Sequence, residues 1–342
     1  MPRHTYARAG VSIAAADRAK ARIKRLAQQT FNPQVLAGIG SFGGLFQLPR
    51  GLRQPVLVAS TDGVGTKLKL AFQTGIHDTV GRDLVNHCVN DILVQGAAPL
   101  FFLDYIALGK MAPATVEALV EGLSRGCREN GCALLGGETA EMPGFYAPGE
   151  YDLAGTIVGA VERRHLITGS AIRPGDVLLG LASAGLPTNG YALARSILFD
   201  HARYRPATRP RGLEGQTVGE ALLAEHRSYL PLLRPLLAKL HGLAHITGGG
   251  IPGNLPRILP AGCQAVIHRQ AWTWPPLFQL LLRLGDVPDA DMWRTFNLGI
   301  GMILVAAPRQ AETVVRALAR RGERAVRLGE IRRGRRGVKI QR

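Results

Sequence analysis

Residues 60–67 read STDGVGTK and place an aspartate, a lysine and two glycines directly after the apolar run 55–60. Glycines lack a Cβ, so their backbone N–H groups can approach an anion closely. The carboxylate of Asp62 suits Mg²⁺, and the ammonium of Lys67 suits phosphate oxygens. The spacing GxxxxGK[ST] of a Walker loop is missing. The segment therefore predicts a phosphate-binding loop of another kind, with a tight turn and a solvated aspartate as the alternative.

A second acidic residue, Asp91, lies in a segment predicted to be helical over residues 79–95, because apolar residues recur there at helical spacing. Asn86 and Asn90 are four residues apart and share one face, with Asp91 beside them. Such polar residues usually mark only the solvent side of a helix. Here the helix leads into a nearly continuous apolar strand, residues 99–108, and ligand sites in such sheets lie near strand ends. The segment favours a nucleotide contact.

A third acidic segment, residues 136–144 (GGETAEMPG), follows a short apolar strand predicted at 133–135. Its two carboxylates are three residues apart and bracketed by glycines, which suits Mg²⁺ held between a protein and a triphosphate. We expect Asp62, Asp91 and Glu138 to converge on one such ion, because Mg²⁺ prefers oxygen ligands. Three acidic segments, each beside a glycine and an apolar strand, are hard to explain as turns alone.

Two glycine-rich segments in the second half of the chain could bind anions or a substrate. Residues 183–191 (SAGLPTNGY) lead into a helix predicted at 190–199, whose N-terminus would be an anion site. The alternative is that Thr188 or Asn189 acts only as an N-cap. Residues 245–250 (HITGGG) set His245 beside three glycines. A lone histidine is more often structural, so a functional and a structural role stay equally open for His245.

Strands and helices alternate in both halves of the chain, which predicts an α/β protein. A turn-rich segment at 168–175 predicts a boundary between two domains, residues 1–168 and 169–342. Pro231 and Pro235 should kink or split the helix expected at 220–240. Further strands are expected at 152–162, 176–183, 265–268, 300–307 and 325–331, and further helices at 113–130, 276–284 and 312–321.

The 342 residues carry a formal net charge of +17, which raises the question of nucleic-acid binding. Only seven of the 42 basic residues are lysine, and they are scattered apart from residues 201–211 and 316–342. A nucleic-acid surface would want aromatic residues among the basic ones, and the basic tail contains none. The scattered distribution of the basic residues therefore argues against nucleic acid as a partner, but the net charge should favour anionic, phosphate-bearing ligands.

No run approaches the roughly 20 apolar residues that span a bilayer, and residues 1–10 lack the apolar core of a secretory signal. The four cysteines, Cys88, Cys127, Cys132 and Cys263, form no CxxC pair. They predict buried free thiols in a reducing compartment. We therefore expect a cytoplasmic protein with no membrane partner.

The motifs resemble those of the phosphoribosylformylglycinamidine cyclo-ligase family, also called aminoimidazole ribonucleotide synthetases. They run in the expected order from Tyr6 to about Met302 and so cover nearly the whole chain. GGETAEMPG is much closer to this family than to its superfamily relatives. The matching pieces are YARAGVSI, RIK at residues 22–24, STDGVGTKLKLA, NDILVQGAAPLFFLDYIA, GGETAEMPG, YDLAGTIVGAVE, NGYALAR, HITGGG, NLPRILP and MWRTFNLGIGM.

The resemblance implies a two-domain fold of mixed α/β (α+β) character and a homodimer whose N-terminal sheets join into a barrel, with ATP bound near that interface. It implies the ATP-dependent closure of formylglycinamidine ribonucleotide to 5-aminoimidazole ribonucleotide, ADP and phosphate, a step of de novo purine biosynthesis. An amide oxygen is a poor leaving group, so it would first be phosphorylated. Positioning and charge neutralisation would then be the protein's task. ATP and Mg²⁺ are the implied cofactors.

The resemblance also implies roles for individual residues. Mg²⁺ would be held by Asp62, Asp91 and Glu138, and the catalytic residues would be Lys24, Asp62, Asn189 and His245. The ribonucleotide substrate would be bound by Thr188, Asn189, Thr247 and Gly248. The nucleotide would be bound by Thr61, Gly63, Gly65, Thr66, Lys67, Asn90, Asp91, Gly136, Gly137, Glu138 and Thr139.

Two positions depart from the family's pattern. Pro187 stands where the family usually has a histidine, which puts the catalytic role of its loop in doubt, and Gly253 stands where the family commonly has glutamate. Within the superfamily, a selenophosphate synthetase would need a reactive cysteine near the N-terminus, whereas the first cysteine here is Cys88 in an apolar helix stripe. The alternative function is an ATP-binding superfamily member with altered catalysis, acting as a regulator or as a kinase of a different small substrate.

Overall fold

The computed structural model describes residue 10 and residues 12–40 and 42–341, and its contacts divide the chain into two units. The first unit runs to Ile92 and continues over Ala98–Glu162. The second contains Leu93–Ala97 and the chain from Arg163 onward. The first matching motif, which starts at Tyr6, lies largely outside the described residues. Among the described residues, no helix is long and apolar enough to cross a membrane.

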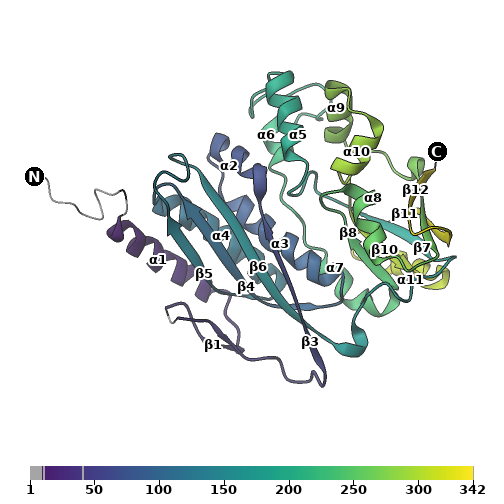
Figure 1. Ribbon diagram of the computed structural model, residues 1–342, viewed down its shortest axis with the longest axis horizontal. Helices are drawn as coiled ribbons and strands as arrows, with labels where there is room; N and C mark the ends of the chain where they lie inside the picture. Colours follow the sequence, from purple (N-terminus) through teal and green to yellow (C-terminus); the bar gives the residue numbers. More distant parts are fainter. Residues whose placement is uncertain (1–9, 11, 41, 342) are drawn as a thin grey trace, which may run out of the picture. The chain divides into compact units, whose positions relative to one another are not determined.

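A four-stranded sheet in the order β3-β6-β4-β5 forms the centre of the first unit (Figure 1). β6 pairs antiparallel with both β3 and β4, whereas β5 pairs parallel with β4. A separate two-stranded sheet joins β1 to β2. The strands of this unit are β1 (Val35–Ala37), β2 (Leu45–Phe46), β3 (Pro55–Gly63), β4 (Ala98–Leu108), β5 (Ala133–Glu141) and β6 (Tyr151–Glu162).

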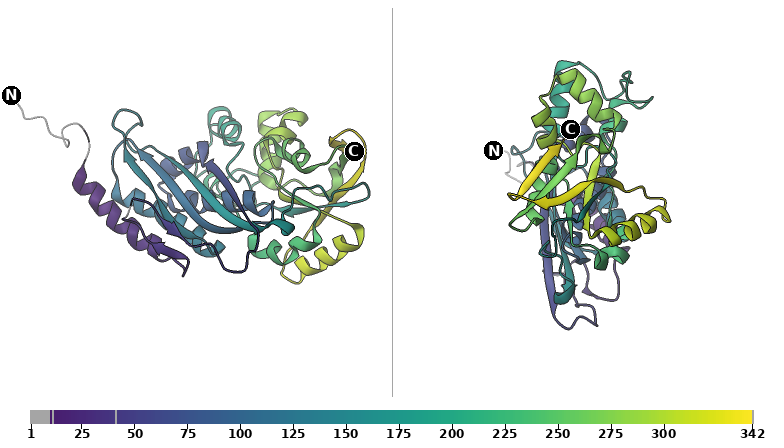
Figure 2. Two further views of the ribbon diagram at one scale, coloured as in Figure 1. Left: turned by 60° about the horizontal axis from the view of Figure 1, so that its bottom comes forward. Right: turned by 90° about the vertical axis from the view of Figure 1, so that its right-hand side faces the viewer.

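Helices cover one face of this sheet, with α3 and α4 against the strands and α1 packed on α4 (Figures 1 and 2). α3 and α4 approach closely because each has a glycine at the contact. A Cβ on Gly122 would lie 1.9 Å from the carbonyl oxygen of Asp78, and one on Gly81 would lie 2.3 Å from that of Leu119. The helical elements are α1 (Ile13–Gln28), η1 (Gly65–Lys67), α2 (Leu68–Thr74), α3 (Asp78–Leu93) and α4 (Pro113–Asn130).

Two segments that the sequence predicted as loops instead continue the strands before them. β3 runs through Asp62 to Gly63, and β5 runs through GGETAE to Glu141. The cause is pairing, because Asp62 lies opposite Gly155 of β6 and Gly137 lies opposite Asp104 of β4. A strand partner satisfies backbone N–H and C=O groups that a loop would leave to water. The acidic residues of both segments therefore stand on a sheet.

A six-stranded sheet in the order β12-β9-β11-β7-β10-β8 forms the centre of the second unit. β12 pairs parallel with β9, and the other neighbours pair antiparallel. β10 is buried along its whole length, as expected for an inner strand between covered faces. The strands are β7 (Val177–Ala182), β8 (Gly242–His245), β9 (Cys263–His268), β10 (Ile300–Ala306), β11 (Val326–Arg333) and β12 (Gly337–Gln341), the last two yellow in Figure 2.

One long helix that the sequence predicted in the second unit is split in the structure. The helix expected at 220–240 is interrupted, because α6 ends at Leu222 and α7 begins only at Leu230. Pro231 and Pro235 stand within the first turn of α7 and of η4, where a missing N–H costs little. The helical elements are η2 (Arg163–His165), α5 (Tyr191–Arg195), the π-helical turn η3 (Ser196–His201), α6 (Val218–Leu222), α7 (Leu230–Leu233), η4 (Arg234–Lys239), α8 (Gly250–Asn254), η5 (Leu255–Ile258), η6 (Arg269–Ala271), α9 (Pro276–Gly285), α10 (Asp289–Thr295) and α11 (Pro308–Ala319).

Candidate active site

A cluster of two aspartates and a histidine joins β3 to α3 in the first unit. Nε2 of His87 lies 2.6 Å from the carboxylate of Asp62 and 3.9 Å from that of Asp91. Ser60 Oγ donates a hydrogen bond to Asp91 at 3.0 Å, and the amide of Gly63 donates to Asp62 at 2.7 Å. One ligand atom from each of the three clustered residues lies within 4.8 Å of the others. The structure thus brings together two of the three carboxylates assigned to Mg²⁺.

The buried imidazole of His87 balances the negative charge of this cluster. Burial alone would lower the pKa of His87, but the hydrogen bond to Asp62 and the charges of nearby aspartates raise it. Burial would likewise raise the pKa of Asp62, yet the hydrogen bond and charge of His87 lower it. The cluster therefore favours an imidazolium beside two carboxylates. The side chains of Asp62 and Asp91 are 40% and 29% exposed, so their outer oxygens can still reach a ligand.

Lys67 points into the core of the first unit. Its ammonium lies 2.5 Å from the carboxylate of Asp83 on α3, and both side chains are fully buried. The expectation that Lys67 meets phosphate oxygens therefore needs correction, because leaving this pair would strand a buried carboxylate. The lysine instead ties the turn after β3 to α3. It positions the segment that also carries Asp62.

Glu138 points to the face of the sheet opposite Asp62. A Cβ on its neighbour Gly137 would lie 2.4 Å from a carboxylate oxygen of the buried Asp104, so Gly137 faces the helix side. Successive strand residues point to opposite faces, so Glu138 faces the open side, where it is exposed. Asp62 and Asp91 meet on the helix side. Within one chain, the expected convergence of three carboxylates is therefore wrong for Glu138.

The other predicted nucleotide residues of the first unit are spread over both sides of the sheet. Thr61 lies on the open side, where its hydroxyl is 2.8 Å from that of Thr156 on β6. Asn90 is fully buried within α3. Lys24, which was predicted to be catalytic, is exposed on α1. The turn after β3 contains Gly65 and Thr66 and follows Gly63, and β5 contains Gly136, Gly137 and Thr139.

Two loops of the second unit leave the same edge of its sheet, because β7 and β8 both pair with the beginning of β10. The side chain of Asn189, in the first loop, lies against Gly248 in the second, where a Cβ would be 3.3 Å from Asn189 Nδ2. Oδ1 of Asn189 is buried and has no hydrogen-bond partner among the described residues. The structure therefore brings the predicted substrate residues Thr188 and Asn189 to the same edge as Thr247 and Gly248.

Asn254 holds the glycine loop of the second unit in place. Its Nδ2 donates to the carbonyl oxygens of Thr247, Gly248 and Gly250 at 3.3, 3.1 and 2.8 Å. Gly250 has a φ of 58°, and a Cβ there would lie 2.0 Å from the carbonyl oxygen of Trp293. Only glycine fits such a position. The loop is therefore a fixed backbone element beside Asn189.

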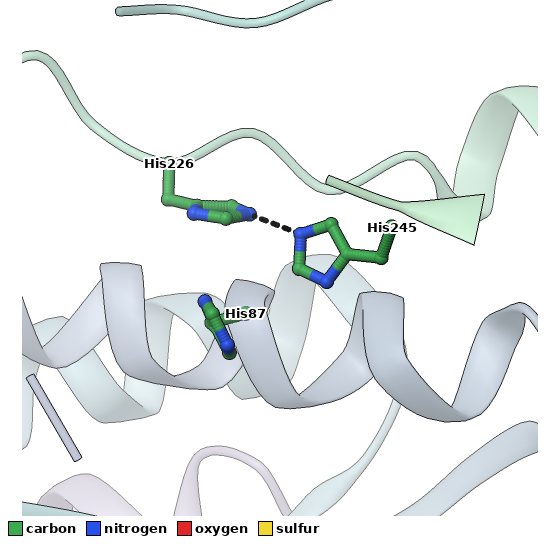
Figure 3. Close-up of side chains that lie close together, drawn as sticks. All are labelled: His87, His226 and His245. Carbon is green, nitrogen blue, oxygen red and sulfur yellow. Dashed lines mark hydrogen bonds between the residues drawn. The ribbon is translucent and has the colours of Figure 1, made fainter. Parts of the chain in front are cut away.

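His245 ends β8 and pairs with a second histidine, His226 (Figure 3). The two Nε2 atoms lie 3.2 Å apart, and the rings meet edge to face with centroids 5.2 Å apart. Both side chains are buried, and both line a small pocket together with Pro187 and Tyr229. The predicted catalytic residue His245 is therefore part of a pair.

Sequence reasoning missed three of these residues: His87, His226 and Asp83. His87 did carry a local signal, because it lies four residues before Asp91 and so on the same helix face. Asp83 carried the same signal, because it lies four residues before His87. His226 carried none, since its partner His245 comes from a separate element.

Two family models match this chain. The model of the AIR synthase related protein, N-terminal domain, matches residues 51–161, and the model of its C-terminal domain matches residues 173–340. Together they cover most of both units. The fold and the site therefore define a two-domain protein of the AIR synthase related class.

Curated relatives narrow this class. The phosphoribosylformylglycinamidine cyclo-ligase of Bordetella petrii is 55% identical over 331 residues, which cover 96% of this chain and 94% of the relative. Those of Sorangium cellulosum and Myxococcus xanthus are 53% and 52% identical, over 96% of this chain and 95% and 96% of the relatives. The chain belongs to the phosphoribosylformylglycinamidine cyclo-ligase family and is a ligase of purine biosynthesis.

Solved structures share the fold at much lower identity. The thiamine-monophosphate kinase from Stenotrophomonas maltophilia has a TM-score of 0.68 and 21% identity, covering 97% of this chain and 96% of the kinase. The hydrogenase maturation protein HypE in complex with ATP has a TM-score of 0.66 and 19% identity, covering 92% of this chain and 88% of that one. These likenesses establish the mixed α/β fold.

Proposed function

We propose that this ligase phosphorylates the amide oxygen of formylglycinamidine ribonucleotide with ATP and then lets the substrate's own amidine nitrogen close the ring. In the first step the oxygen bonds to the γ-phosphorus of ATP and ADP leaves. In the second a C–N bond forms, the C–O bond breaks with phosphate as leaving group, and one proton is released. The observation that carries this proposal is the 52–55% identity to named cyclo-ligases over nearly the full chain.

The acidic cluster of the first unit supports binding of the ATP phosphates together with Mg²⁺. Carboxylate oxygens are the donors that Mg²⁺ takes in proteins, and those of Asp62 and Asp91 lie close enough to share an ion. These two carboxylates therefore fit Mg²⁺, which would neutralise negative charge on the ATP phosphates. His87 holds the first carboxylate by a hydrogen bond and the second by its charge.

The remaining nucleotide assignments stay proposals with unequal support. Gly65 and Thr66 follow the acidic strand directly and offer backbone N–H groups to phosphates, whereas the amide of Gly63 donates to Asp62. Thr61 and Glu138 lie on the other sheet face, so they would serve a nucleotide only at an interface that covers this face. Thr139 is the next residue of β5 and points back to the helix side. Lys24 would act from the exposed side of α1.

The two loops of the second unit support binding of the ribonucleotide substrate. Oδ1 of Asn189 is a buried acceptor whose partner a substrate N–H or O–H would supply. The fixed backbone of Thr247 and Gly248 lies beside it. We assign His245 to proton transfer in ring closure, because imidazole exchanges a proton near neutral pH. Pro187 has no group that exchanges a proton, but His226 and His245 line the same pocket.

We also propose a homodimer that covers the open face of the first sheet. Strand residues of β3 and β4 on this face include Leu57, Leu103 and Tyr105, which are 58%, 36% and 39% exposed. Apolar side chains gathered on one face mark interaction surfaces. A second copy of the chain would present the same face, so the contact can be symmetric.

We place the protein in the cytoplasm. The support is that all four cysteines are free and buried, as expected for thiols kept in a reducing compartment.

The test is ADP release measured with and without formylglycinamidine ribonucleotide. We expect release to depend on the ribonucleotide and to match the aminoimidazole product one to one. Asp62→Asn should lower kcat at least about 100-fold, because a charge that organises the phosphates is lost. The exposed Asp200→Asn of the second unit is the matched control and should behave as wild type. ADP release without ring closure would instead support a member of altered catalysis, and normal turnover by Asp62→Asn would remove Asp62 from the scheme.

A further inference from the structure

His226 reaches His245 from a segment that is firmly attached to the second sheet. The hydroxyl of Tyr229 donates to the carbonyl oxygen of Ala182 at 2.8 Å, and Arg227 donates to the same oxygen at 3.2 Å. Arg227 also forms a 2.6 Å ion pair with Glu323. The end of β7 thus fixes the chain on the C-terminal side of His226, so the imidazole is held where it lies.

The contact between the two rings has a chemical consequence. Each ring meets the other through Nε2, at 3.2 Å, so one nitrogen must donate a proton and the other must accept it (Figure 3). If His245 donates from Nε2, its Nδ1 is left as an acceptor and can act as a base. If His226 donates, a neutral His245 carries its proton on Nδ1 and can act as an acid there. The proton between the two rings therefore links the tautomer of His245 to that of His226.

The lining of the pocket around the pair combines small, apolar and charged residues. Its lining includes Pro187, whose side chain has no polar atom, and the glycines Gly185 and Gly301. A Cβ on Gly301 would lie 2.0 Å from the Tyr229 hydroxyl, so that glycine leaves room for the anchoring tyrosine. Glu225 and Arg227 also border the pocket as charged groups, and Arg227 is engaged by Glu323.

We propose that His226 is a positioning residue that sets the tautomer and orientation of His245 for proton transfer during ring closure. The inference rests on the proposed function, because His245 is given its role there. His226 acts through His245 and need not touch the substrate. A mere packing role for His226 would predict that an apolar side chain of similar size replaces it without loss.

Three variants separate these roles. His226→Leu removes the nitrogen, whereas His226→Gln keeps a side-chain amide near the position of Nε2, and His226→Asn is too short to reach His245. We expect kcat to fall at least about tenfold in the Leu and Asn variants, with the KM for ATP unchanged and most of kcat restored in the Gln variant. His201→Leu, which changes an exposed histidine of the same unit, is the matched control.

The second readout is the tautomer of His245, followed by ¹⁵N NMR of the imidazole nitrogens. Wild type and His226→Gln should show one tautomer, and His226→Asn should show a mixture. Wild-type kcat in folded His226→Leu, or an unchanged His245 spectrum in both the Leu and Asn variants, would overturn the proposal. If wild type released no substrate-dependent ADP, the proposed function would fail by itself, and the spectra would still decide whether His226 orders His245.

Discussion

Asp104 places a carboxyl group in the core of the first unit. It stands on β4, is 9% exposed, and faces the backbone of Gly137 across the sheet. Burial raises the pKa of Asp104 to about 7, its own backbone amide opposes the shift, and the charge of Glu138 adds to it. The folded protein therefore keeps this carboxyl protonated over a range in which the unfolded chain has lost the proton.

The sign of the pH dependence follows from this difference. Between the ordinary pKa of 3.8 and about 7, the folded state binds one proton more than the unfolded state. The free energy of unfolding should therefore fall as pH rises through this range. Above about pH 7 the whole cost of ionising the buried carboxyl has been subtracted from the stability. Asp104→Asn removes this cost, because an amide does not ionise. The variant should match wild type near pH 4 and be more stable at pH 8, by up to roughly 4 kcal/mol.

Urea unfolding at pH 4.5, 6 and 8 measures this effect. Asp17→Asn, an exposed aspartate on α1, is the control and should show a small difference that does not change with pH. A difference for Asp104→Asn that is constant over the three pH values would contradict the assignment of the proton to this carboxyl.

At the scale of helices and strands, the close packing of α3 on α4 sets the position of the acidic cluster. A Cβ added at Gly122 of α4 would lie 1.9 Å from the carbonyl oxygen of Asp78 at the start of α3. Backbone cannot yield as a flexible side chain can, so the helices would have to move apart. α3 carries both His87 and Asp91, so such a shift would also disturb the cluster.

We therefore expect Gly122→Ala to destabilise the protein by about 1–3 kcal/mol, although alanine is the better helix former. Thermal unfolding and urea titration would measure the change. Gly253→Ala is the matched control, because a Cβ at that helical glycine would meet only an ordinary contact at 4.0 Å. The control should be neutral or slightly stabilising. Equal effects in both variants would rule out the steric explanation.

At the scale of the whole molecule, the open face of the first sheet leads to a prediction about assembly. Light scattering after size-exclusion chromatography should give the mass of two chains for wild type. Tyr105→Asp should yield folded monomers, because a charge on this face would lose its hydration in the interface. Ile76→Asp, an exposed apolar residue outside the strands, should leave the dimer intact. A wild-type monomer at micromolar concentration would refute the proposed dimer.

Local patterns in the sequence were sufficient for several long elements, although the 16-residue helix α1 was not predicted. The predicted helix 113–130 is α4, the predicted helix 79–95 is α3 within two residues at each end, and the apolar run 99–108 is β4 with one further residue. The motifs also identified the family. β8 and β12 were not predicted, because four or five residues hold little periodicity.

The sequence by itself determined which residue types are present and how they are spaced: acidic residues beside glycines, apolar strands, and a histidine before a glycine loop. The tertiary structure decided which of them meet. Strand pairing carried β3 and β5 through segments that resemble loops, and the alternation of side chains along β5 sent Glu138 away from Asp62. The partners of Lys67 and His245 come from separate elements, and local sequence patterns contain no information about such contacts.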